Sequence, residues 1–63
     1  MKTVFVDELH TKEFGATLEP INPIHLVVGS KVMIGGWFYI VDDSFLSVEH
    51  NKTPEMVVVV HKA

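Results

Sequence analysis

The sequence predicts an all-β domain, a small antiparallel meander of five to six strands that closes into a barrel. Residues with β-branched side chains dominate, with eleven valines, four isoleucines and four threonines, whereas alanine occurs twice and glutamine and arginine are absent. Short apolar runs are interrupted by Gly, Pro, Asn and Asp, and no window of about 11 residues or more shows the apolar spacing of an amphipathic helix. Both observations favour strands joined by turns.

The composition limits the class of protein further. The 63 residues, 48% of them hydrophobic, are enough for one domain spanning 1–63. A net charge of −3 without arginine argues against nucleic acid as a partner. The absence of cysteine excludes disulfides, thiolate metal sites and a catalytic thiol. The apolar runs Trp37–Val41 and Met56–Val60 are far shorter than the ~18 residues of a membrane span, so we expect a cytoplasmic protein without membrane contact.

The first half of the chain is predicted to hold one strand and a long loop. Thr3–Leu9 is predicted to be the first strand, with Val4 and Val6 on one face and Phe5 on the other, and the chain turns polar after it. The connection over residues 10–23 contains Pro20 and Pro23, which lack amide donors and favour extended geometry in the residues before them. His25–Val28 is predicted to be extended.

The second half contains the clearest turn in the chain. Gly35 and Gly36 separate the apolar stretches Lys31–Ile34 and Trp37–Val41, as in a hairpin with a two-residue loop, where positive φ angles favour glycine.

Two further turns are expected. Asp43-Ser44 is predicted to form a second tight loop leading to a strand over Phe45–His50. Residues 51–54, Asn-Lys-Thr-Pro, then lead to a last strand over Glu55–His61.

The expected order resembles an SH3-like barrel, in which a long loop after the first strand precedes an antiparallel sheet with short loops. The resemblance is one of architecture. The acidic-aromatic motif and the paired aromatics and proline of peptide-binding SH3 domains have no counterpart in this sequence.

The period of two in a strand assigns side chains to faces if the turns above set the register. The predicted barrel interior contains Val32, Ile34, Trp37, Tyr39, Val41, Leu46, Val48, Val57 and Val59. The opposite face is also apolar, and we expect it to be an interface made by Met33, Phe38, Ile40, Phe45, Met56, Val58 and Val60.

An apolar face of this size on a small domain favours self-association, as a homodimer or a larger oligomer. The alternative is a monomer in which the long loop lies across that face. The carboxylates expected to face a protein partner are Asp7, Glu8, Asp42, Asp43 and Glu49.

The residues that bear chemical groups have ordinary structural explanations, and we expect neither an enzyme nor a cofactor or metal site. The four histidines are scattered without a ligand motif; His10 and His50 are expected at turns and His25 half-buried. Asp42-Asp43-Ser44 has the composition of a turn rather than of an acid/base pair.

The sequence therefore favours a non-enzymatic protein-binding module, a homo-oligomeric accessory or inhibitor protein that occupies the surface of an unidentified protein partner. Stand-alone chains of this size are common among phage and mobile-element proteins. A connector or ring subunit of a larger assembly is the alternative. The third hypothesis is a barrel that binds a ligand or nucleic acid with Trp37 and Tyr39, although both aromatics fit the core better.

Overall fold

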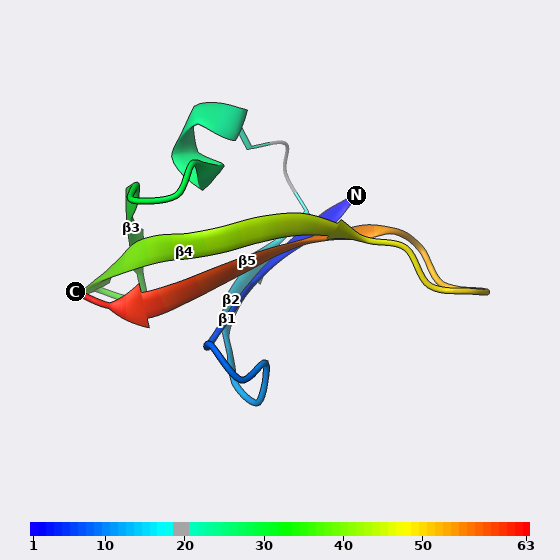
Figure 1. Cartoon of the computed structure of the whole chain (residues 1–63), viewed down its shortest axis with the longest axis horizontal. Coiled ribbons are helices and arrows are strands. Elements are labelled where there is room, and N and C mark those ends of the chain that lie inside the picture. The colour runs from blue at the N-terminus through cyan, green and yellow to red at the C-terminus, as the bar shows by residue number, and fades with distance from the viewer. Residues whose placement is uncertain (19–20) are drawn as a thin grey trace.

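The computed structural model describes residues 1–18 and 21–63 as five strands and one turn of 3-10 helix. The elements are β1 (Lys2–Val6), β2 (Glu13–Thr17), η1 (Pro23–Leu26), β3 (Lys31–Ile34), β4 (Trp37–Ser47) and β5 (Glu55–Lys62). Figure 1 shows β4 and β5 side by side as a long hairpin, with η1 on one side of it and the β1–β2 turn on the other.

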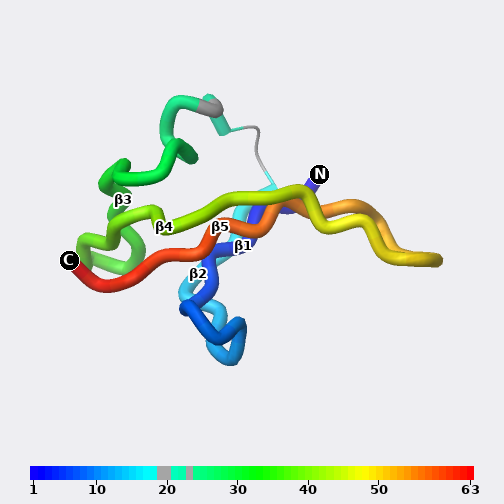
Figure 2. Tube along the Cα trace, in the orientation of Figure 1, coloured from blue at the N-terminus to red at the C-terminus, as the bar shows by residue number. Residues whose placement is uncertain are grey.

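The strands form one sheet in the order β2-β1-β5-β4-β3, curled into a half-barrel. The fold class predicted from the sequence is confirmed, since the architecture is nearly all-β with five strands and is consistent with a small SH3-like barrel. Three pairings are antiparallel, but β1 pairs with β5 in parallel. The trace in Figure 2 shows this crossover, which places the first and last strands together in the middle of the sheet.

The centre of the sheet is β5, which is buried on both faces. Its four consecutive valines, Val57 to Val60, are each at most 8% exposed. Val58 and Val60 pack in the main core with Tyr39 and Val41. Val57 lies beside Val4, itself 5% exposed, on the opposite face. A fully apolar strand is what burial on both faces requires.

The hairpin at Gly35 and Gly36 is confirmed. Ile34 pairs with Trp37, and the glycine φ angles are +59° and +87°, as in a two-residue turn in which both central residues have positive φ.

The predicted second hairpin at Asp43-Ser44 is wrong, because β4 continues through it as a strand of 11 residues. Neither residue adopts the positive φ of a tight hairpin, and the Asp43 carboxylate instead accepts a hydrogen bond of 2.9 Å from the Ser44 amide. A β-bulge at Asp42 interrupts the register, with Val41 opposite Val60 and Asp43 opposite Val59. Of the strand expected over Phe45–His50, residues 45–47 form the end of β4, and residues 48–50 lie outside any strand.

The faces of β5 also differ from the prediction, because the last hairpin has another register: Ser47 pairs with Glu55, whereas a loop over residues 51–54 would pair His50 with Glu55. The core is made by Val58 and Val60, not by Val57 and Val59. The proposed seven-residue interface is therefore wrong in part, because Val58 and Val60 are 0% and 1% exposed and Met56 packs against the core.

The loop expected after the first strand contains a strand that the sequence analysis missed. β2 pairs with β1, and a second bulge places Phe14 between the pairs Phe5–Gly15 and Val6–Glu13. The Phe14 ring lies 4.8 Å from the ring of Tyr39, measured between centroids. Phe14 thereby joins β2, at one edge of the sheet, to the core on β4.

The two edge strands of the half-barrel approach each other at Gly15 of β2 and Ile34 of β3. A Cβ atom added at Gly15 would lie 3.0 Å from Cγ2 of Ile34. A side chain here would require Ile34 to move by a few tenths of an ångström, so glycine allows the close approach where the sheet curls toward closure.

The segment predicted to be extended over His25–Val28 begins in the 3-10 helix η1. The Asn22 carboxamide caps η1 by accepting a hydrogen bond of 3.1 Å from the Ile24 amide. The Ser44 hydroxyl donates to the Leu26 carbonyl at 3.1 Å and joins η1 to β4. The expected extended geometry at Glu19-Pro20 lies outside the described residues.

Replacing Val58 by Ala tests the central position of β5. We expect a loss of ~2 kcal/mol in the free energy of unfolding, because two buried carbon atoms are removed and a cavity remains. The exposed Val48, which is 67% accessible, is the matched control, and Val48→Ala should cost less than ~0.5 kcal/mol. Urea denaturation of both variants measures the difference, and equal losses would contradict the described core.

Candidate functional site

An exposed apolar patch covers the outer face of the β3–β4 hairpin. Met33 and Phe38 are cross-strand partners and remain 64% and 49% exposed, next to the half-buried Ile40. We call these three residues the β3–β4 patch. They belong to the interface expected from the sequence, and the structure brings them together.

Charged groups border the β3–β4 patch. Lys31 lies opposite Ile40, and its ammonium is 4.5 Å from the centroid of the Phe38 ring. His61 lies opposite Ile40 on β5, and its Nδ1 is 2.7 Å and 2.8 Å from the two carboxylate oxygens of Asp42. The bulge places Asp42 so that it contacts the last strand.

A second surface feature is a groove between the β1–β2 turn and the β4–β5 hairpin, with a volume of about 550 Å³. Its floor is apolar and consists of Val4, Val6, Val57 and Phe45. Phe45 is 38% exposed there. We call this feature the inter-hairpin groove, and its size lies within the range of ~300–1,000 Å³ typical of ligand pockets.

One wall of the inter-hairpin groove depends on Asp7. Its carboxylate accepts hydrogen bonds from the Thr11 amide at 2.7 Å, the Thr11 hydroxyl at 2.6 Å and the Lys12 amide at 3.0 Å. These bonds hold the pKa of Asp7 below its usual value, with the Thr11 hydroxyl as the largest cause. The turn so formed holds His10 at φ +57°, with its ring stacked 5.8 Å from that of Phe45.

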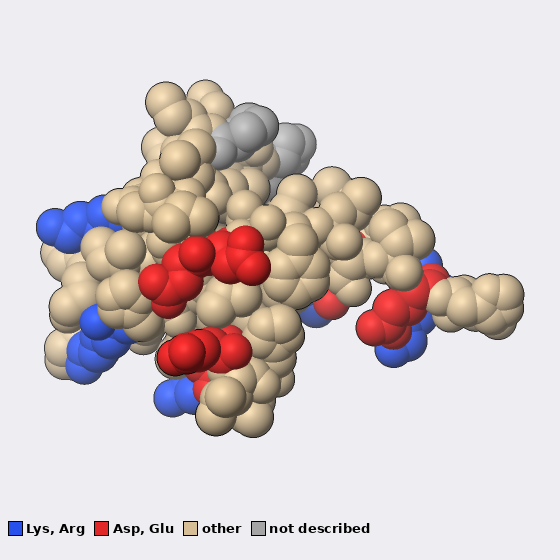
Figure 3. All heavy atoms as spheres, viewed as in Figure 1, with Lys and Arg blue, Asp and Glu red and all other residues tan. Residues whose placement is uncertain are grey.

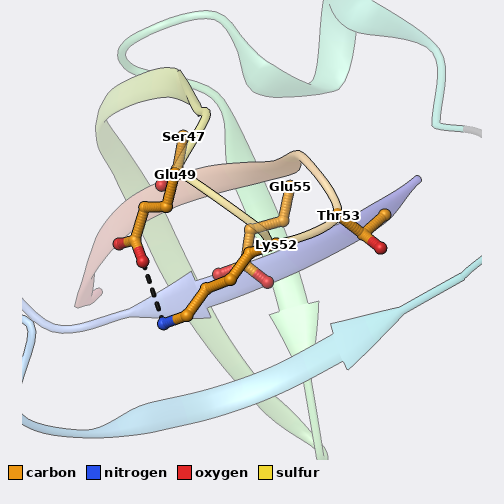
Figure 4. Close-up of a pocket in the computed structure, with 5 residues that line it drawn as sticks. All are labelled: Ser47, Glu49, Lys52, Thr53 and Glu55. Carbon is orange, nitrogen blue, oxygen red and sulfur yellow. Dashed lines mark ion pairs between the residues drawn. The ribbon is translucent and has the colours of Figure 1, made fainter.

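The opposite wall comes from the ends of β4 and β5. Glu49 and Lys52 form an ion pair of 2.9 Å across the connecting loop, which raises the pKa of Lys52, chiefly through the hydrogen bond. Figure 4 shows this pair with Ser47, Thr53 and Glu55 around a smaller hollow of about 230 Å³. Ser47, Glu49 and Glu55 line both hollows.

Carboxylates are spread over the surface between these features. Figure 3 shows acidic groups in the middle of one face and near the β1–β2 turn, and another beside a lysine at the projecting β4–β5 hairpin.

The five carboxylates predicted to face a partner are not one cluster. Asp7 holds the β1–β2 turn, Asp42 contacts His61, Asp43 binds the Ser44 amide, and Glu49 pairs with Lys52. Glu8 is exposed in the β1–β2 turn. Of this set, Glu49 lines the inter-hairpin groove, where it joins Phe45 from the predicted interface.

The aromatic pair Trp37 and Tyr39 is divided by the fold. Tyr39 is 8% exposed and belongs to the core, as predicted, so its ring faces Phe14 rather than a ligand. The expectation that Trp37 is also buried is wrong: it is 58% exposed, and the Lys62 ammonium lies 3.7 Å from the centroid of its ring. Trp37 lies beside the glycine turn at the end of the sheet, beyond the core.

The described histidines do not form a metal-binding cluster. Among the described residues, no group of three or more histidine or carboxylate side chains is placed to hold a metal ion. His25 is exposed on η1, so its predicted half-burial is wrong. No helix in the described part of the chain has the length and apolar character needed to span a membrane.

Comparison of the chain with protein-family models, curated proteins and solved structures gave no match.

Sequence reasoning did not find the inter-hairpin groove, because its walls come from turns far apart in the chain. A signal for one wall was present in Asp7 and Thr11, since an aspartate followed by a threonine at a polar turn is typical of side-chain capping. The stacking of His10 on Phe45 depends on the curl of the sheet and has no local signal.

Replacing Asp7 by Asn tests the turn that positions His10. A folded-state pKa below 3.8 means that the Asp7 charge stabilises the fold above that pH, and that this contribution is lost as the pH falls through the lowered value. We expect Asp7→Asn to unfold more easily than wild type from about pH 7 to pH 5, and the two curves to converge toward about pH 2.

Urea denaturation across this pH range provides the measurement. Glu8→Gln, which removes an exposed charge from the same turn, is the control for the change in net charge. A constant difference between Asp7→Asn and wild type down to about pH 2 would contradict the role given to the carboxylate.

Proposed function

We propose that the chain is a non-enzymatic protein-binding module that acts as a homodimer through the β3–β4 patch. The observation that carries the proposal is the exposure of the Met33–Phe38 cross-strand pair, at 64% and 49%. Neighbouring apolar side chains left in water on a small domain usually mark an association surface.

Charge complementarity supports a second copy as the occupant of the patch. Ile40 pairs with Lys31 on β3, and Asp42 follows Ile40 two residues later on β4. A twofold axis passing over Ile40 would place Lys31 of each copy opposite the partner's Asp42. Such an isologous contact closes after two copies.

A dimer of this kind would present two copies of every other surface to a partner protein. We infer an accessory or inhibitor role, in which the module acts by occupying a partner's surface.

The first test is the solution mass by light scattering over a range of concentrations. We expect wild type to approach twice the monomer mass of 7.1 kDa, and Phe38→Glu to remain a folded monomer because two carboxylates would be buried in the interface. The matched control is Val48→Glu, which places the same charge on an apolar side chain 67% exposed outside the patch and should still dimerise.

A charge exchange tests the geometry of the dimer. Lys31→Glu and Asp42→Lys should each weaken association, whereas the double variant should restore it, by about threefold to tenfold in the dissociation constant. A monomeric wild type would contradict the proposal, and a closed ring of more than two copies would favour a connector subunit instead.

A further inference from the structure

The inter-hairpin groove combines an apolar floor with acidic walls. Val4 and Val57 form the buried part of the floor, and the ring of Phe45 remains 38% exposed above them. An exposed aromatic ring in a hollow is suited to contact with an apolar side chain. The groove shares no residue with the β3–β4 patch, so binding in it would not require dimerisation.

Three glutamates line this groove, one on each of three segments. Glu13 lies at the start of β2, Glu49 in the β4–β5 loop and Glu55 at the start of β5. Within the described part of the chain, Lys52 forms an ion pair with Glu49, and the charge of Glu55 also helps to raise the pKa of Lys52. The basic groups on the lining are His10 and Lys12.

The basic groups of the lining face aromatic rings. The Lys12 ammonium lies 5.3 Å from the centroid of the Phe14 ring, and His10 is stacked on Phe45. The lining holds three carboxylates against one lysine, and Lys52 at its border pairs with Glu49, so the groove keeps a negative charge that would repel an anionic ligand.

We propose that the inter-hairpin groove binds a basic segment of a partner protein, in which an apolar side chain is flanked by lysine or arginine. The apolar side chain contacts Phe45 and the valine floor. The flanking cations lie at the groove walls and pair with Glu13 and Glu55. The ion pair of Glu49 with Lys52 holds the loop that closes the groove on the β4–β5 side.

Binding in the groove requires an apolar contact and the pairing of cations with carboxylates at the same time. A purely cationic ligand would lack the contact with Phe45, and a purely apolar one would lack the pairing with the glutamates. Exposed ion pairs are weak and sensitive to salt, so binding should decrease as the ionic strength rises.

The test uses the full chain and fluorescently labelled peptides as probes. The peptide Lys-Lys-Leu-Lys-Lys should bind, as measured by fluorescence anisotropy, and shift the backbone amide NMR signals of Val6, Phe45 and Ser47. Lys-Lys-Gly-Lys-Lys and Glu-Glu-Leu-Glu-Glu should bind at least about tenfold more weakly, since each lacks one of the two features recognised.

Two double variants with the same net charge distinguish binding in the groove from attraction of the peptide by the net charge of the whole protein. Glu13→Gln with Glu55→Gln should weaken binding of Lys-Lys-Leu-Lys-Lys by about fivefold at low salt. Glu8→Gln with Asp43→Asn removes two charges outside the groove and should leave binding close to that of wild type. If Glu55→Gln unfolds the chain, Glu13→Gln with Glu49→Gln replaces it in the comparison.

Several results would overturn the proposal. These are no binding of Lys-Lys-Leu-Lys-Lys by wild type, equal weakening by both double variants, and equal binding of the glycine peptide. Displacement of the peptide by spermine at equal concentration would also overturn the proposal, because such a result would identify the groove as a site for small cations. Phe38→Glu should bind the peptide like wild type, so failure of dimerisation and failure of the groove are distinguished.

Discussion

The sheet depends on the burial of β5 on both of its faces. Val58 and Val60 form the core with Tyr39 and Val41, while Val57 and Val59 are covered on the opposite face. A flat sheet of a 63-residue chain would leave one of these faces in water, and burial of both requires strong curling. The remaining strands are arranged around this constraint.

Much of the fold was predictable because its signals are local. The β composition, the glycine turn and the strand at Val57–Val60 follow from nearby residues, and the structure confirms them. The register of β4 was not predictable, because the bulge at Asp42 depends on pairing with a strand that begins after residue 54. The face of β5 was not predictable either, because the loop before it is longer than the four residues expected, so the candidate interface was correct in exposure at Met33 and Phe38 but not at Val58.

The two bulges determine which side chains reach each surface. At Phe14 the extra residue places a ring against Tyr39 and leaves Gly15 at the close approach to Ile34. At Asp42 the extra residue places a carboxylate beside His61 at the border of the β3–β4 patch. The core and the candidate binding surfaces thus depend on the same local irregularities.

The parallel pairing of β1 with β5 also has a consequence for synthesis of the chain. β1 leaves the ribosome first, yet its neighbour in the middle of the sheet follows about fifty residues later. Until then β1 and β2 have no sheet to join, and the β3–β4 hairpin lacks the strand against which it packs. A long closure of this kind slows folding, so the unfinished chain exposes its strand edges to other chains or to chaperones.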